Sequence, residues 1–413
     1  MTDLMNPMLD EDDEEEVSVT PRFSIRRPAE PVSAPAEVAK QPWEKPHRSP
    51  EEEARVEALK ASGNVPTGKK KRRNSMTEKD AVLLAFLSVF RVATAEQLSL
   101  LLTTAGVHGN EAGKMASPKT VLNRLLRLRE IGAVQDASIW AEQRIWGVTN
   151  FGRGAAIAYG LVERDSQIQP KGLQNLNYTE LPHRLAVNWV AAQLLSPFGF
   201  YRDVLKLPQR VSFGMLRSEY EVNSAWFKVN QRLAAENKLA RGGNGSAPVR
   251  SFKDWRSDML REVHARVASG DLAYRDAADS EPGLWTLGQT PAPGDDMREH
   301  HLPDLVVDLE RFRKNSARPS LAFEVELKAK SVGSYRKQLR MWAADLQQLK
   351  DYPAPLLYGR LIFVTNLSLV EERLREADEK EKLGLFESGK LRVLPLTGRD
   401  GKTPLSLTSH VEV

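Results

Sequence analysis

The chain has 413 residues, a formal net charge of +4 and no cysteine. The near balance of charge means that any contact with nucleic acid has to rest on local basic patches, and the lack of cysteine excludes a disulfide frame and a thiolate metal site. The longest apolar run near the start, 81–90, is too short to span a bilayer. The N-terminal residues lack the basic region and apolar core of a signal peptide. We therefore expect a cytoplasmic protein without membrane contact, long enough for two or three domains.

Residues 1–75 are expected to form a disordered tail. They open with an acidic block, Asp10–Glu16, continue through a Pro-rich stretch and finish with the basic run Lys69–Arg73. Low apolar content and blocks of like charge cannot sustain a hydrophobic core. The basic run either contacts a phosphate backbone or only solvates a linker, and the acidic block could compete with DNA for a basic face of the folded part.

Residues 76–161 follow the order of a winged helix-turn-helix domain. Two predicted helices each begin at a capping box, Ser75–Glu78 and Thr94–Gln97. A third helix is predicted to start at the N-cap Ser117 and to end at Gly132. Two short strands with a turn between them follow, and a short helix beginning near NFGRG closes the domain. Three helices followed at once by a hairpin are typical of this fold.

The third helix has an apolar face and a polar face. On a helical wheel its buried arc would contain five residues: Val121, Leu122, Leu125, Leu126 and Leu128. The opposite arc carries side chains that suit phosphates and base edges, and these are the candidate contacts with double-stranded DNA: Lys119, Thr120, Asn123, Arg124 and Arg127. Arg144, near the wing tip, is a candidate phosphate or minor-groove contact. The alternatives are an ordinary solvated helix face and a protein-binding winged helix.

Residues 177–413 are predicted to form an α/β domain with an insertion at about 208–300. A helix is expected at 182–195, and the insertion contains two helical stretches, at 223–239 and 255–267. After it the pattern predicts, in order, strand, strand, helix, strand, helix, strand. That order is typical of a sheet covered by helices.

Two of these strands bring charged residues together. Pro303 and Asp304 open the first strand, and FEVEL in the second alternates, so Glu324, Glu326 and Lys328 would share one face. We expect Asp304, Glu326 and Lys328 to converge at the strand ends, with Glu324 at the rim. Carboxylate oxygens suit Mg²⁺, so Asp304 and Glu326 would be the metal ligands. A solvated or salt-bridged strand face is the alternative.

The two histidines before this strand, His300 and His301, are interpreted as flanking or phosphate-contacting residues. Zinc binding is not expected, because neither cysteine nor further clustered histidine completes a zinc site.

The spacing of Pro303–Asp304 and Glu326–Lys328 resembles the PD-(D/E)xK nuclease superfamily. The resemblance implies a nuclease-like fold in which an acidic pair binds Mg²⁺ and a lysine supports the attacking water. A further acid often comes from the upstream helix, for which Glu180 is the nearest candidate. It therefore implies catalytic roles for Asp304, Glu324, Glu326 and Lys328.

The combination of segments resembles the replication-relaxation family of plasmids, conjugative elements and phages. The segments that carry the resemblance are TAEQL, LRLREIGAV, LPHRLAVN, HLPDLVVDL and FEVELKAKS. They cover about residues 76–195 and 300–365. The family commonly has a Thr shortly after its acidic-x-acidic strand end, where this chain has KAKS, and Lys328 brings the site closer to the nuclease pattern.

Three functions follow as expectations. The first is a DNA-binding accessory or regulatory protein acting in replication, relaxation or transfer of a mobile element. The second is a Mg²⁺-dependent endonuclease. The third is a protein-interaction adaptor whose partner would be a relaxase, a replication protein or another mobile-element protein.

Overall fold

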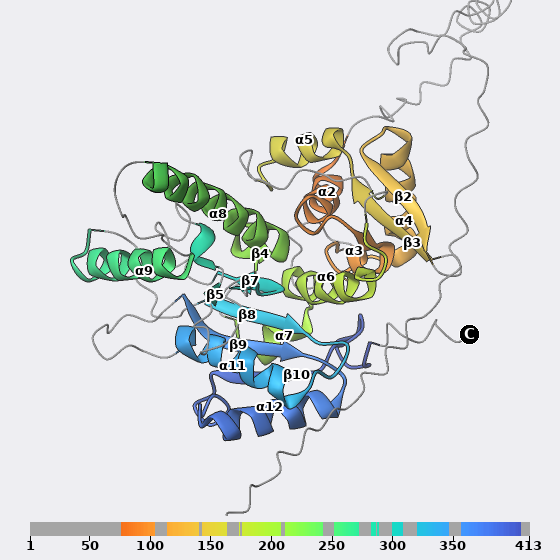
Figure 1. Ribbon diagram of the computed structural model, residues 1–413. Coiled ribbons are helices and arrows are strands. Elements are labelled where there is room, and N and C mark those ends of the chain that lie inside the picture. The colour runs from red at the N-terminus through yellow and green to blue at the C-terminus, as the bar shows by residue number, and fades with distance from the viewer. Residues whose placement is uncertain are drawn as a thin grey trace, which may run out of the picture. The chain divides into compact units, whose positions relative to one another are not determined.

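The structure is a computed structural model. It describes residues 76–103, 114–139, 143–162, 173, 176–207, 211–242, 252–271, 282–285, 287–288, 300–308, 320–346 and 357–405. The predicted tail at 1–75, including its basic run, lies outside the described residues, as does most of the turn predicted between the two wing strands. Figure 1 shows the labelled elements in chain order.

The N-terminal region is mainly helical, with one small antiparallel sheet. The sheet has the strand order β1-β3-β2. Three helices precede the β2–β3 pair, as predicted, and one follows it. The elements are α2 (Glu78–Phe90), β1 (Ala93–Thr94), α3 (Ala95–Ser99), α4 (Pro118–Glu130), β2 (Val134–Ile139), β3 (Gln143–Val148) and α5 (Asn150–Ala158).

Side-chain caps start the first two helices. Thr94 and Gln97 form the predicted capping box of α3. In α2 the box is formed by Thr77 and Asp80; the predicted box at Ser75–Glu78 was therefore misplaced by two residues. Both positions offer a hydroxyl three residues before a carboxylate, and the sequence spacing alone does not separate them.

Both ends of α4 follow the sequence prediction. Ser117 caps the helix by accepting a hydrogen bond from the backbone N–H of Thr120, with Pro118 in the first turn. Gly132 follows the helix with φ at +76°, a conformation that favours glycine. Within the predicted buried arc, three residues are buried, whereas Leu122 and Leu126 are only partly buried.

A five-stranded mixed sheet forms the second part of the chain. Its order is β10-β9-β8-β7-β4, with β8, β9 and β10 parallel and β7 and β4 antiparallel to their neighbours. The strands are β4 (Leu216–Ser218), β7 (Leu305–Val307), β8 (Ser320–Val325), β9 (Tyr358–Val364) and β10 (Leu391–Leu394). A separate pair consists of β5 (Leu287–Gly288) and β6 (His300–His301).

The helices of this part are α6 (Leu181–Leu195), α7 (Phe200–Val204), α8 (Glu219–Gly242), α9 (Phe252–Ala268), α11 (Val332–Leu346) and α12 (Ser368–Glu381). Short 3₁₀ turns occur at Phe213–Met215 and Pro282–Trp285. The predicted order from residue 300 onward is confirmed. The segment predicted as an insertion contributes a strand to the sheet itself, because its strand β4 forms the edge of the sheet beside β7.

The register of β7 and β8 gives the sheet two buried faces. Leu305 is paired with Phe323, and both belong to the core that includes the N-terminal helices. Val306 is paired with Ala322, and both belong to a second core under α11 and α12. Because side chains alternate along a strand, Glu324 points to the α11 side.

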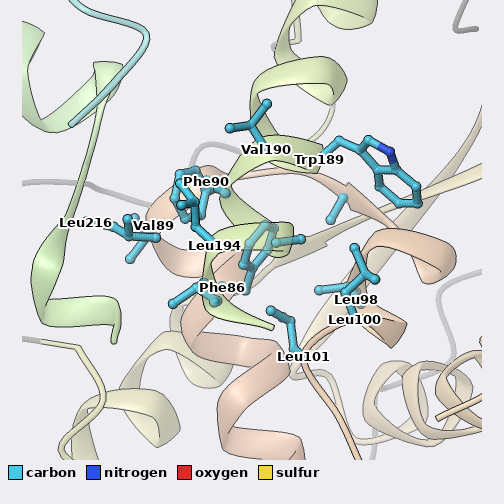
Figure 2. Packing of buried hydrophobic residues seen from close by; sticks show 14 of the residues in the cluster. Phe86, Val89, Phe90, Leu98, Leu100, Leu101, Trp189, Val190, Leu194 and Leu216 are labelled. Atoms are coloured by element: carbon cyan, nitrogen blue, oxygen red, sulfur yellow. The ribbon is translucent and has the colours of Figure 1, made fainter. Parts of the chain in front are cut away.

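One hydrophobic core joins the N-terminal helices to α6 and the sheet. We call it the shared core, and Figure 2 shows part of it: Phe86, Val89, Phe90, Leu98, Leu100, Leu101, Trp189, Val190, Leu194 and Leu216. Hydrogen bonds also connect the N-terminal region to α6. Gln97 Nε2 donates to the carbonyl of Leu185 at 2.6 Å, and Asn188 Nδ2 donates to the carbonyl of Val92. The two predicted domains, 76–161 and 177–413, are therefore packed against each other through buried apolar side chains.

No helix in the described part of the chain is both long enough and apolar enough to cross a membrane.

Candidate functional site

Asp304 directly precedes β7, beside the end of β8, and lies at the centre of a cluster of charged side chains. Its Oδ2 accepts a hydrogen bond from the backbone N–H of Val325 at 2.7 Å. Its Oδ1 lies 3.1 Å from Nε2 of His183, near the start of α6. Since Val325 stands between Glu324 and Glu326 in the chain, the Asp304 carboxylate lies beside the strand end that carries both glutamates. The expected approach of Asp304 to this strand end is confirmed.

Glu324 is buried beneath α11. Its side chain lies 2.6 Å from Nε2 of His301, and the amide of Gln338 on α11 is 3.3 Å from the same nitrogen. Glu324 is 3% exposed, so the expectation that it would lie at the rim was wrong. The sheet face toward α11 is covered by helix, and a carboxylate on that face needs a buried partner.

Glu326 binds Lys330 and not the predicted Lys328. The ion pair joins Lys330 Nζ to Glu326 Oε1. β8 ends at Val325 and the backbone bends at residues 327–328, so the strand alternation does not extend to Lys328, whose side chain is exposed. The predicted convergence of Lys328 with Asp304 and Glu326 stays a prediction.

A further acid near the site is Glu219, at the start of α8, and the charge of the predicted Glu180 contributes to raising the pKa of Glu219. The backbone N–H of Glu219 donates to the carbonyl oxygen of Asp304 at 3.2 Å. This bond comes from the pairing of β4 with β7, so it depends on the edge strand. Glu180 also binds Arg184 and Asn177 on its own segment.

We call Glu219, Asp304, Glu324 and Glu326 the carboxylate cluster. Burial raises the pKa of Glu219, Glu324 and Glu326 above the ordinary value, and the charge of Asp304 adds to each rise. Burial alone would lower the pKa of His183, but the hydrogen bond and charge of Asp304 outweigh it and raise that pKa to about 9. For His301, too, burial alone would lower the pKa, but the charge and hydrogen bond of Glu324 outweigh burial and raise it.

Three of the four acids in the cluster are thus paired with cations of the protein itself. His183 faces Asp304, His301 faces Glu324 and Lys330 faces Glu326. Among the described residues no group of three or more His, Asp and Glu side chains is placed to hold a metal ion. The oxygen ligands suit Mg²⁺, but in this arrangement the carboxylates of Asp304 and Glu326 already have partners. The predicted magnesium site stays a prediction.

The outer face of α4 divides into two parts. Lys119, Thr120 and Asn123 are exposed. Arg124 and Arg127 are bound to the carboxylate of Asp80 on α2, which is 0% exposed. The five candidate DNA contacts therefore differ in how readily they can bind DNA, because two of them, Arg124 and Arg127, already form ion pairs with a buried acid.

Arg144 lies on β3 and shares a carboxylate with the end of α4. Its Nη1 is 3.5 Å from Oδ2 of Asp136 on β2, and Arg129 Nη1 is 3.2 Å from the same carboxylate. Both guanidinium side chains are more than 40% exposed. An exposed ion pair of this kind is weak, so Arg144 can exchange Asp136 for a phosphate.

Several residues of the site were missed from the sequence. His183 and Lys330 stand in the segments LPHRLAVN and FEVELKAKS, which had been singled out for other reasons. His301 had been interpreted as a flanking or phosphate-contacting residue, and its contact with Glu324 was not predicted. Glu219 gave no signal, because its position depends on the pairing of a three-residue edge strand.

No family model, no curated protein and no solved structure matches the chain. The resemblance to the replication-relaxation family and to PD-(D/E)xK nucleases therefore stays a prediction.

Proposed function

We propose that the protein binds double-stranded DNA and acts as an accessory or regulatory factor. In this proposal the N-terminal region is a winged helix-turn-helix and α4 is its recognition helix. The observation that carries the proposal is the exposed group Lys119, Thr120 and Asn123 on α4, next to the β2–β3 pair with Arg144. Recognition helices in such folds read base edges from their N-terminal part.

The chemistry of this face suits DNA. Lysine neutralises phosphate, and asparagine can bind adenine through two hydrogen bonds. Ser117 accepts the Thr120 N–H, so the first turn of α4 is fixed. The fixed first turn holds the backbone of Lys119 and Thr120, whose side chains are exposed.

The five-stranded sheet has, in this proposal, a PD-(D/E)xK-like fold that serves as a binding or assembly platform. The internal ion pairs of the carboxylate cluster support that role, since three of its acids are held by His183, His301 and Lys330. A role in replication, relaxation or transfer of a plasmid, conjugative element or phage, and a relaxase or replication protein as partner, rest on the sequence resemblance alone.

The test measures, by anisotropy at several salt concentrations, the binding of a fluorescent duplex that the wild-type protein selects from a randomised pool, with the unselected pool as a second probe. The variant Lys119→Ala/Asn123→Ala should weaken binding by about 1–3 kcal/mol and reduce the salt slope by about one. The matched control is Lys380→Ala on α12, where the lysine pairs with Glu376 on the protein surface. Wild-type affinity in the double variant would remove α4 from DNA recognition, and a wild-type protein without salt-sensitive binding would favour the adaptor hypothesis.

A Mg²⁺-dependent endonuclease is the second candidate. It is favoured by the meeting of Asp304, Glu326 and Lys330 at one strand end, although Lys330 stands two residues beyond the lysine position of the nuclease pattern, which is Lys328. Supercoiled plasmid incubated with Mg²⁺ or Mn²⁺, compared with EDTA and with Asp304→Asn, tests it. Nicking that requires the metal and Asp304 would establish this function, and intact plasmid in every lane would exclude it under these conditions.

A further inference from the structure

The side chain of Asp80 is fully buried at the contact between α2 and α4. It is 0% exposed, although it is charged and stands in the first turn of α2. A buried carboxylate without partners would be strongly unfavourable. The groups around Asp80 must therefore stabilise its negative charge.

Four hydrogen bonds satisfy this carboxylate. Oδ2 accepts from the backbone N–H of Thr77 at 2.9 Å, from the Thr77 hydroxyl at 2.7 Å and from Arg127. Oδ1 accepts from Nη1 of Arg124 at 3.0 Å. Burial alone would raise the pKa of Asp80, but the bonds from Thr77 and Arg127 outweigh it and hold that pKa below the ordinary value. Asp80 is thus a buried anion on α2 that also binds two side chains of α4.

The two arginines come from one side of α4. Arg124 and Arg127 are three residues apart, and residues at that spacing are neighbours on a helix surface. Because both bind one carboxylate on α2, α4 cannot rotate about its axis without breaking an ion pair. Together with the buried side chains of Val121, Leu125 and Leu128, this contact keeps Lys119, Thr120 and Asn123 facing outward.

The same contact limits the charge that α4 offers to phosphates. The side chains of Arg124 and Arg127 are 29% and 33% exposed, and Asp80 binds the guanidinium group of each. An arginine released from Asp80 would be able to bind any phosphate, and such contacts carry no sequence information.

We propose that Asp80 is a positioning residue for DNA recognition: by binding Arg124 and Arg127 it stabilises the rotation of α4 that the buried face sets, and it keeps the two arginines from binding phosphates indiscriminately. The inference rests on the proposed function, since it concerns the same helix face. It assigns to Asp80 the discrimination between duplex sequences, beyond any effect on folding.

The experiment compares binding of two duplex probes by the full chain. One probe is a duplex selected from a randomised pool by the wild-type protein, and the other is the unselected pool. The measured quantity is the ratio of the two affinities, which is independent of the fraction of protein that is folded. The variants are Asp80→Asn, which removes the charge at constant shape, and Arg127→Lys, which keeps the charge but loses the planar fork.

The matched control is Asp345→Asn. Asp345 is also a buried acid bound to an arginine, Arg256, but it joins α9 to α11. It therefore has the same chemistry and a comparable effect on stability, without contact to α4. Thermal melts of all three variants record how much each one destabilises the fold.

We expect the affinity ratio to fall by about ten-fold in Asp80→Asn, the size of one lost base contact, and by less in Arg127→Lys. The salt slope of Asp80→Asn should become steeper, because the released arginines contact phosphates. Asp345→Asn should keep the wild-type ratio even where its melting temperature falls. If Asp80→Asn does not fold, Arg127→Lys decides.

A wild-type ratio and salt slope in Asp80→Asn and Arg127→Lys would overturn the positioning role and leave the proposed function intact. An equal loss of ratio in Asp345→Asn would do the same, because the effect would then follow stability. A wild-type protein with no salt-sensitive binding to either probe would overturn the proposed function itself.

Discussion

The ion pair between Arg256 and Asp345 should be the most costly charge pair to break in the second half of the chain. Arg256 on α9 binds both carboxylate oxygens of Asp345 on α11, at 2.7 and 3.0 Å, and it also donates to the carbonyl of Leu284. The two residues are 6% and 5% exposed. Replacing Asp345 by Ala removes the carboxylate that two guanidinium nitrogens of the buried Arg256 bind.

The expected magnitude follows from that burial. Removing one partner of a buried pair costs about 3–5 kcal/mol, because the remaining charge is uncompensated. Replacing both partners by Leu should cost less than Asp345→Ala, since no buried charge remains; the carbonyl of Leu284 then loses its donor, at about 1–3 kcal/mol. As a surface control, Glu371→Ala breaks an exposed pair with Arg375 and should cost at most about 0.5 kcal/mol.

Urea unfolding followed by circular dichroism measures all three variants. We expect Asp345→Ala to be the least stable variant, followed by the double Leu variant and then by Glu371→Ala. A loss below about 1 kcal/mol for Asp345→Ala would mean that Arg256 finds water or another partner. A double variant less stable than Asp345→Ala would mean that the pair contributes more than it costs to bury, and either result would refute the argument.

Two further predictions concern α5 and His183. Gly152→Ala should cost at least about 1 kcal/mol, because its Cβ would overlap the backbone carbonyl of Ala133, whereas Gly154→Ala on the same helix meets open space and should be neutral or stabilising by about 0.5–1 kcal/mol; thermal melts compare the two. The pKa of His183 is raised from an ordinary 6.5 to about 9, so the stability from its pair with Asp304 is fully present below pH 6.5 and is lost as the pH rises through about 9. Urea midpoints of wild type and His183→Gln should therefore converge as the pH rises across that window, and a constant difference would contradict the assignment.

Local features of this chain were predictable because their causes lie within a few residues. The Thr94–Gln97 capping box, the Ser117 cap and the positive φ of Gly132 each depend on neighbours in sequence. Apolar periodicity likewise predicted the helix and strand order after residue 300, which the five-stranded sheet bears out. The sequence also predicted that Asp304 would reach the end of β8, since a Pro-Asp pair before one strand and an acidic alternation in the next imply adjacent pairing.

Tertiary structure alone decided which side chains share a partner. From the sequence, either Lys328 or Lys330 could pair with Glu326. In the structure β8 ends at Val325, the backbone then bends, and Lys330 forms the ion pair with Glu326. Arg124 and Arg127 look like free DNA contacts on a helical wheel, until α2 brings the buried Asp80 to them. The packing of the N-terminal helices onto α6 and β4 in the shared core was not predicted either. A wheel or a strand alternation gives the direction of a side chain from its own element, whereas the charge or apolar surface that it meets belongs to an element distant in the chain.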